Sequence, residues 1–305
     1  MLQTARRRWR KALPLLVSVG LMVWLFRQVP FHAVLAAALQ LPWQVLVPIT
    51  VVMVLALYAW DGLCLPAVYG TNRSPFGYLA AIRARGLAYL LGAFNYELGE
   101  ALVAWRISRV QKTSYIATLS RSVVLAYHDA LLLAGAGLAG ALVADDLPVA
   151  PRVRLLCIVL LAGLLAAGAA IALLPRNLRR RFEATRWGAW LESWTWSRSL
   201  RLLLLRVVYY AFFGVYATAV LRISGIELSW AAMLGTIPIV LLAVTLPSVS
   251  GLGPRETALC VLLGPEHREV LLAIGLFMST GQMLSRLAIG LVNLWLCRGR
   301  SVFEE

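Results

Sequence analysis

The chain has 305 residues, of which 61% are apolar and 14% are charged, and its formal net charge is +15. Soluble domains contain roughly 45–50% apolar and about 25% charged residues, so this composition excludes an ordinary soluble protein. The positive charge does not indicate nucleic-acid binding, because the basic residues lie in short segments between apolar blocks. That distribution is the one described by the positive-inside rule for membrane proteins.

The apolar residues form continuous blocks of the length that spans a membrane. About twenty apolar residues in a helix cross a hydrocarbon core of roughly 30 Å, whereas strands of membrane barrels alternate apolar and polar residues. We therefore predict an all-α, polytopic membrane helical bundle. No signal-peptide cleavage site follows the first block, so we expect it to stay as the first helix. In chain order, the predicted spans are residues 13–29, 43–69, 115–143, 153–174, 202–221 and 270–297.

Basic and acidic clusters predict the orientation of these spans, because basic residues are enriched on the cytoplasmic side. The basic clusters lie at residues 6–11, 106–112, 176–201 and 298–300. The acidic segments, expected outside, lie at residues 145–146 and 266–269. The pattern predicts a multi-pass protein of the inner (cytoplasmic) membrane with both termini in the cytoplasm. The basic cytoplasmic loop at 176–201 should contact anionic lipid headgroups.

The same orientation requires two apolar segments to return to the side from which they enter. Arg73 and Arg106 both favour the cytoplasm, so residues 76–105 are predicted to form a re-entrant hairpin with a polar turn at 95–100. Residues 230–263 must likewise enter and leave from the outside, with residues 247–256 at the tip. The two hairpins would then enter from opposite faces.

Short matches between the two halves favour an inverted repeat. The tripeptide Leu-Ser-Arg at 119–121 recurs at 284–286, and both hairpin tips contain a Leu-Gly pair followed by a glutamate. Repeats of opposed topology are typical of many transporters. We predict a single transmembrane domain over residues 1–305, with a first repeat at 43–143 and a second at 202–297.

Charged residues inside the apolar segments are the sharpest functional signal. Each costs at least about 2.5–3.5 kcal/mol on insertion scales, so it needs a partner or a function. Asp61, Arg83 and Arg85 are interpreted as side chains that extend to the interface. The other intramembrane charges either form ion pairs that only join helices, for example Glu100 with Arg121 and Glu256 with Arg286, or line a polar path. The predicted substrate-binding set is Glu100, Arg121, Asp129, Gly251, Gly253, Arg255, Glu256 and Arg286.

The tip at residues 247–256 predicts an anion site. Pro247, Gly251 and Gly253 indicate a broken helix, and broken backbone at membrane depth is tolerated only where protein or a watery cavity covers it. Half-helix ends present free N–H groups to an anion. We hypothesise one cavity in which arginines receive an anionic headgroup and glutamates neutralise the empty arginines. Its lining would be Glu100, Arg121, Arg255, Glu256 and Arg286.

Metal, cofactor and catalytic motifs are not found. The four cysteines and three histidines have no metal-ligand spacing, and no phosphate-binding loop of an ATPase occurs. We therefore predict no metal, no cofactor and no enzymatic activity. Any driving force must come from a gradient, a partner or mass action.

Residues 247–256 read Pro-Ser-Val-Ser-Gly-Leu-Gly-Pro-Arg-Glu. This stretch resembles the P-x-x-x-G-x-G-x-x-E motif of the flippase-like membrane family that includes the transmembrane region of lysylphosphatidylglycerol synthases. Gly99-Glu100, Arg106, Arg121 and Asp129 resemble its first-half pattern, although the proline that commonly precedes the first Gly-Glu is missing here. The resemblance covers roughly residues 10–297. It implies lipid translocation without aminoacyl transfer, because no soluble synthase domain follows in this sequence.

The expected function is transporter-like translocation of an anionic or zwitterionic lipid, or of a polyprenyl-phosphate-linked lipid, with membrane lipids as the partners. Two alternatives stay open: a membrane-embedded enzyme of lipid or cell-envelope biosynthesis, and a non-catalytic partner of such a complex. A transporter should gather its charges around one cavity. An enzyme should cluster acids beside a pocket for a soluble co-substrate, and a scaffold should have no continuous polar cavity.

Overall fold

A computed structural model describes residues 2–70, 76–143, 150–185, 187–188, 190–191, 194–246, 248–249 and 251–296, and it describes side chains from residue 14 onwards. No strand occurs in these residues, and the elements α1 to α13 are all α-helices, which confirms the predicted all-α class. Four of the features used above lie outside the described residues: Arg73, the acidic pair at 145–146, Pro247 of the hairpin tip and the arginines at 298 and 300.

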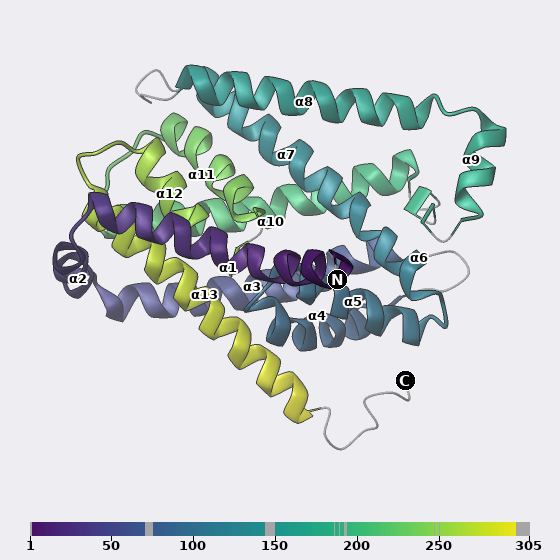
Figure 1. Cartoon of the computed structure of the whole chain (residues 1–305), viewed down its shortest axis with the longest axis horizontal. Coiled ribbons are helices and arrows are strands. Elements are labelled where there is room, and N and C mark those ends of the chain that lie inside the picture. The colour runs from purple at the N-terminus through teal and green to yellow at the C-terminus, as the bar shows by residue number, and fades with distance from the viewer. Residues whose placement is uncertain are drawn as a thin grey trace. The chain divides into compact units, whose positions relative to one another are not determined.

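Figure 1 labels the helices in chain order. Their bounds are α1 Leu2–Gln28, α2 Phe31–Gln40, α3 Trp43–Tyr69, α4 Tyr78–Gly92, α5 Tyr96–Val110, α6 Tyr115–Ser120, α7 Ser122–Val143, α8 Ala150–Ala172, α9 Arg176–Glu183, α10 Trp196–Ile223, α11 Trp230–Val244, α12 Pro254–Leu262 and α13 Arg268–Leu296.

Five helical segments are long and apolar enough to cross a bilayer, by their length and composition: α3, α6 together with α7, α8, α10 and α13. On α8, the side chains of Leu155, Ile158 and Val159 are all at least half exposed. A helix that exposes so much apolar surface suits contact with lipid rather than with water. These helices place the chain in the class of multi-pass helical membrane proteins.

The first predicted span, residues 13–29, corresponds to the second half of α1, which ends at Gln28. Among the described residues, the segment Pro14–Gln28 meets the criterion for a span only together with α2, and the two are bent by 91°. Pro30 lies at the bend, directly before α2. Proline lacks the N–H that would continue the helix, which explains why the apolar block does not run on as one straight helix.

The chain folds into two compact units that interleave along the sequence. Unit 1 consists of Met1–Val52, Leu133–Ile158 and Gly214–Leu284, and unit 2 consists of Met53–Leu132, Val159–Phe213 and Ser285–Glu305. Each has an apolar core: Cys157, Val240 and Leu259 belong to that of unit 1, and Leu65 and Val103 to that of unit 2.

In unit 2, helices α4 and α5 pack against each other as a helical hairpin (Figure 1). Asn95 ends the turn between them, because its side chain accepts a hydrogen bond of 3.0 Å from the Leu98 N–H and caps α5. Two glycines let the helices approach closely: a Cβ on Gly99 would lie 2.8 Å from the Cα of Gly92. The helix pair predicted at 76–105 is thus present, and α5 continues to Val110.

In unit 1, helices α11 and α12 form a second packed pair. Between them, Gly251 and Gly253 have φ angles of +79° and +94°, which residues with a Cβ rarely adopt. Pro254 then begins α12, and the Glu256 side chain accepts a hydrogen bond of 2.6 Å from the Gly253 N–H. The helix break that the sequence predicted at this tip is therefore built by its two glycines and capped by its glutamate.

Candidate functional site

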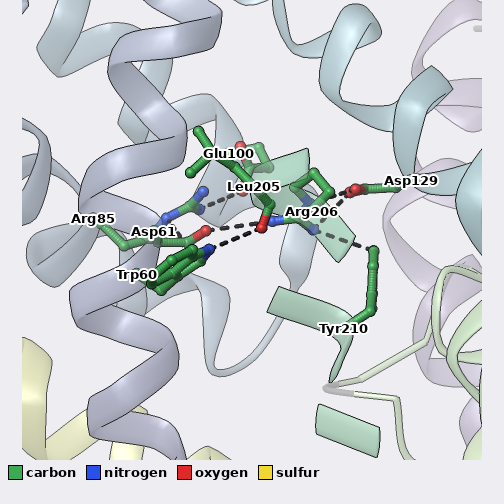
Figure 2. A network of polar contacts seen from close by, with 8 residues as sticks. All are labelled: Trp60, Asp61, Arg85, Glu100, Asp129, Leu205, Arg206 and Tyr210. Atoms are coloured by element: carbon green, nitrogen blue, oxygen red, sulfur yellow. Dashed lines mark hydrogen bonds and ion pairs between the residues drawn. The ribbon is translucent and has the colours of Figure 1, made fainter. Parts of the chain in front are cut away.

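Five charged side chains form one chain of ion pairs inside unit 2 (Figure 2). Their order is Glu100–Arg85–Asp61–Arg206–Asp129, so each arginine lies between two carboxylates. They come from five different helices, α5, α4, α3, α10 and α7 in that order. None of the five side chains is more than 13% exposed. Buried charges are tolerated when they are paired, and the alternation of sign provides that pairing.

Arg206 is the best-bonded member of the chain. Its Nε and Nη2 donate to the two carboxylate oxygens of Asp129 at 2.5 and 2.8 Å, and Nη1 lies 3.5 Å from Asp61 Oδ1. Nη2 also donates to the Tyr210 hydroxyl at 3.2 Å, and the guanidinium carbon lies 4.0 Å from the ring centre of Tyr209. The two-pronged bond to Asp129 and the cation–π contact together fix this guanidinium in one orientation.

Arg85 is shared between the other two carboxylates. Its Nε lies 3.0 Å from Asp61 Oδ2, and its Nη1 donates to Glu100 Oε1. The second oxygen of Glu100, Oε2, is buried and has no hydrogen-bond partner among the described residues. Glu100 as a residue is only 8% exposed. It is therefore an end member of the chain that is held through one oxygen only.

A small cavity lies beside the ion-pair chain. Its walls include Asp61, Arg85, Glu100, Arg206 and Arg286. Its water-accessible volume is about 40 Å³, which is enough for about three water molecules. The cavity thus combines three arginines and two carboxylates in a unit whose remaining interior is largely apolar.

Arg286 differs from the other two arginines of the cavity. Its guanidinium carbon lies 5.6 Å from the ring centre of Tyr89, and no carboxylate among the described residues lies within ion-pair distance of it. The side chain is half-buried on α13. An arginine offers five N–H donors in a planar fork, so Arg286 brings an unused set of donors to the cavity wall.

A second cavity shares Glu100 with the first. It is lined by Tyr96, Glu97, Glu100, Leu119, Ser122, Leu125 and Ala126. Its water-accessible volume is about 210 Å³, and it is more open to the surroundings than the first cavity. Tyr96, Glu100 and Leu125 belong to the walls of both cavities. We call the first the inner cavity and the second the outer cavity; Glu100 is the charged residue that they share.

Arg121 has a capping position at the end of α3. Its Nη1 donates to the carbonyl oxygen of Tyr69 at 3.3 Å, and Gln111 Nε2 donates to the same oxygen at 3.0 Å. The last carbonyl groups of a helix have no partner within the helix, and a cation is favourable there. The structure thus gives Arg121 a helix-capping contact and gives Glu100 a different arginine, Arg85, as its ion-pair partner.

Unit 1 contains a separate polar cluster around the start of α12. Glu256 is fully buried, and its Oε1 accepts from the Ser279 hydroxyl at 2.7 Å while Oε2 caps Gly253. Arg255 donates to Ser279 at 3.2 Å and to the side-chain oxygen of Gln282 at 3.1 Å. The polar groups of α12 and α13 thereby hold the broken tip against the last helix.

The residues predicted from the sequence fall into two groups. Unit 2 contains Glu100, Arg121, Asp129 and Arg286, and unit 1 contains Gly251, Gly253, Arg255 and Glu256. The structure brings Glu100 and Asp129 into one ion-pair chain and places Arg286 in the wall of the inner cavity. The four residues of unit 1 lie together at the tip before and within α12.

Two interpretations from the sequence are wrong. Asp61 and Arg85 do not extend to an interface, because each is 5% exposed and both belong to the ion-pair chain. Arg206, which joins Asp61 to Asp129 in that chain, is not among the residues singled out from the sequence. The available signal was its position inside the predicted span 202–221, where a charge needs an internal partner.

The described residues contain no group of three or more His, Cys, Asp or Glu side chains that could hold a metal ion. In comparisons with known proteins, no family model, no curated protein and no solved structure matches this chain. The resemblance to the flippase-like family therefore stays a prediction from the residues quoted above.

Proposed function

We propose that the protein translocates an anionic or zwitterionic lipid, or a polyprenyl-phosphate-linked lipid, between the leaflets of the cytoplasmic membrane. In this proposal the α4–α5 and α11–α12 pairs are re-entrant hairpins that enter from opposite faces as parts of an inverted repeat. Both termini are cytoplasmic, as the basic segments favour. The proposal extends the resemblance to the flippase-like family and adds a specific place for the lipid headgroup.

The observation that carries the proposal is Arg286 in the wall of the inner cavity. Two arginines of that wall, Arg85 and Arg206, are already occupied by carboxylates, whereas the ring of Tyr89 is the only partner of Arg286 among the described residues. A phosphate group matches the two-pronged donor geometry of a guanidinium. An anionic headgroup is therefore the ligand that would use the donors that the protein leaves unused.

The distribution of charges supports binding as well as helix joining. If the buried charges only joined helices, each arginine would have carboxylate partners, as Arg206 has in Asp61 and Asp129. The polar cavity and Arg286 would then add only the cost of a charge within the membrane. A transported headgroup gives both features a role, because it needs a polar, hydrated place inside the bilayer while its chains stay in lipid.

Transport of labelled lipids by the reconstituted protein tests the proposal. The full-length chain is placed in liposomes that contain headgroup-labelled phosphatidylglycerol, phosphatidylethanolamine or a polyprenyl phosphate. Access of a membrane-impermeant reagent then measures how fast the label crosses. We expect at least one of these lipids to cross faster than in protein-free liposomes. Arg286→Gln should lower the rate at least about tenfold, which corresponds to about 1.4 kcal/mol of lost stabilisation.

The matched control is Arg176→Gln. Arg176 is exposed on α9 and lines neither cavity, so this variant removes the same charge and should transport at the normal rate. Chromatography of the lipids after the assay separates the alternatives: an unchanged lipid supports a transporter, and a chemically altered lipid supports an enzyme. If no lipid of the panel crosses faster than without protein, the proposed function is wrong.

A further inference from the structure

We infer that Glu100 takes up one proton when an anionic headgroup binds, so that lipid movement is coupled to proton movement. The inference rests on the proposed function, because it assigns the coupling of the same cavity. Four observations carry it: the oxygen of Glu100 that has no partner among the described residues, the second partner of Arg85, the balance of charges around the inner cavity, and the presence of Glu100 in the walls of both cavities.

The first observation distinguishes Glu100 from the other two acids. Asp129 uses both carboxylate oxygens in its two-pronged bond to Arg206, and Asp61 uses one oxygen toward Arg206 and the other toward Arg85. Glu100 uses only Oε1, and Oε2 is buried without a hydrogen-bond partner among the described residues. A proton can therefore be added to Oε2 without breaking an existing bond.

The second observation concerns what happens to Arg85 when Glu100 becomes neutral. Arg85 keeps its ion pair with Asp61 at 3.0 Å, so its charge is not left without a partner. A protonated Glu100 can still accept from Arg85 through Oε1. Neutralising Asp129 instead would remove the two-pronged partner of Arg206. The chain of ion pairs thus tolerates the loss of charge at its Glu100 end.

The third observation is the charge balance. The ion-pair chain and Arg286 together contain three carboxylates and three arginines, so their formal charges cancel: Asp61, Glu100 and Asp129 against Arg85, Arg206 and Arg286. The remaining titratable groups in the wall of the inner cavity are the phenols of Tyr89, Tyr96 and Tyr209. A bound phosphate monoester or diester adds at least one negative charge, and one proton on Glu100 restores neutrality.

The fourth observation is a route for the proton. Glu100 belongs to the walls of both cavities, and the outer one is larger and more open. The outer wall also contains Glu97, which is exposed. Water in the outer cavity can therefore deliver a proton to Glu100, as acidic side chains do in other proton-linked transporters. On binding, hydronium and the carboxylate give water and the carboxylic acid; on release of the headgroup, the same proton returns to water.

Thermodynamic linkage then requires that protons and headgroup favour each other's binding. If the bound state holds one more proton than the empty state, the affinity for the headgroup falls by up to about tenfold for each unit of pH increase in the range where that proton is exchanged. A proton gradient would in the same way drive an anionic lipid toward the side where protons leave. This coupling would supply the driving force in the absence of an ATPase motif.

Proton uptake can be measured directly with the purified full-length protein. Short-chain phosphatidylglycerol is titrated into the protein by calorimetry in two buffers that differ in ionisation enthalpy, which gives the number of protons bound per lipid. We expect about one proton in the wild type, none in Glu100→Gln, and about one in the control Glu183→Gln. Glu183 pairs with Arg179 on α9 and lines neither cavity.

Transport provides the second readout. In proteoliposomes, the wild type should move labelled phosphatidylglycerol several-fold faster with an imposed pH difference than without it, whereas Glu100→Gln should be insensitive to the pH difference. If the wild type binds or moves the lipid without proton uptake and without a response to the pH difference, the coupling is refuted and the proposed function stands. If Glu100→Gln still takes up a proton, a different group is the acceptor and the inference is refuted. If the wild type neither binds nor moves any lipid of the panel, both conclusions fail together.

Discussion

Replacement of Arg206 by methionine should destabilise the fold, because it leaves a buried carboxylate of the ion-pair chain without its partner. Arg206 provides both bonds of Asp129 and one of the contacts of Asp61. Without it, Asp129 has no ion-pair partner among the described residues, whereas Asp61 keeps Arg85. One buried carboxylate is then left uncompensated, and removal of one partner of such a pair costs about 3–5 kcal/mol.

Unfolding in mixed detergent micelles, followed by tryptophan fluorescence, measures this loss. We expect a decrease of about 3–5 kcal/mol in the free energy of unfolding for Arg206→Met. The double variant Arg206→Met with Asp129→Leu should recover at least about 2 kcal/mol, because it removes the orphaned charge together with its former partner. Glu183→Gln on α9 breaks a half-exposed pair with Arg179 and should change stability by less than about 1 kcal/mol.

Two results would refute this reasoning. A loss of less than about 1 kcal/mol for Arg206→Met would mean that the charges of the chain do not depend on each other for compensation. A double variant less stable than the single variant would mean that Asp129 has its main partner elsewhere.

Three further predictions concern the hairpins and the two ends of the ion-pair chain. Gly99→Ala should destabilise the α4–α5 pair, because the new Cβ would lie 2.8 Å from the Cα of Gly92. Gly92→Ala should be tolerated, because its Cβ would lie at an ordinary 3.6 Å from the Cα of Gly99. Hydrogen exchange of the two helices measures the difference between the variants. Gly253→Ala should cost about 1–3 kcal/mol in unfolding experiments because of its φ of +94°, and an unchanged stability would contradict that origin. Glu100→Gln should lower the free energy of unfolding less than Asp129→Asn, because Glu100 is bound through one oxygen and Asp129 through both; the reverse order would contradict this description of the chain.

The spans were the most predictable part of the fold, for a simple physical reason. Hydrocarbon imposes a minimum length and an apolar composition on any helix that crosses it, and α3 begins and ends where the apolar block at 43–69 does. The helix break before α12 was also visible, because the glycines that permit positive φ angles and the glutamate that caps the helix stand in the sequence itself. The bend at Pro30 had an equally local signal, and the predicted first span ends at residue 29, directly before it.

The partners of the buried charges could not be predicted in the same way. Arg83 and Arg85 stand two residues apart in the same apolar block, so they point to different sides of α4. Only the packing of α4 against other helices determines which of the two enters the interior, and it is Arg85. The sequence shows that a charge needs compensation, whereas the identity of the compensating residue depends on contacts between segments as far apart as Asp61 and Arg206.

The ion-pair chain ends in a carboxylate on both sides, but the two carboxylates differ in how many of their oxygens are bonded. At one end, the planar guanidinium of Arg206 meets both oxygens of Asp129, so neither oxygen of this carboxylate is left without a bond. At the other end, Arg85 divides its donors between Asp61 and Glu100, and one oxygen of Glu100 has no bond within the described part of the chain. The acid at this end, Glu100, also lines both cavities. An acid that can lose its charge without leaving an arginine unpaired, and that lines both cavities, is where uptake of a proton together with an anionic headgroup would perturb the fold least.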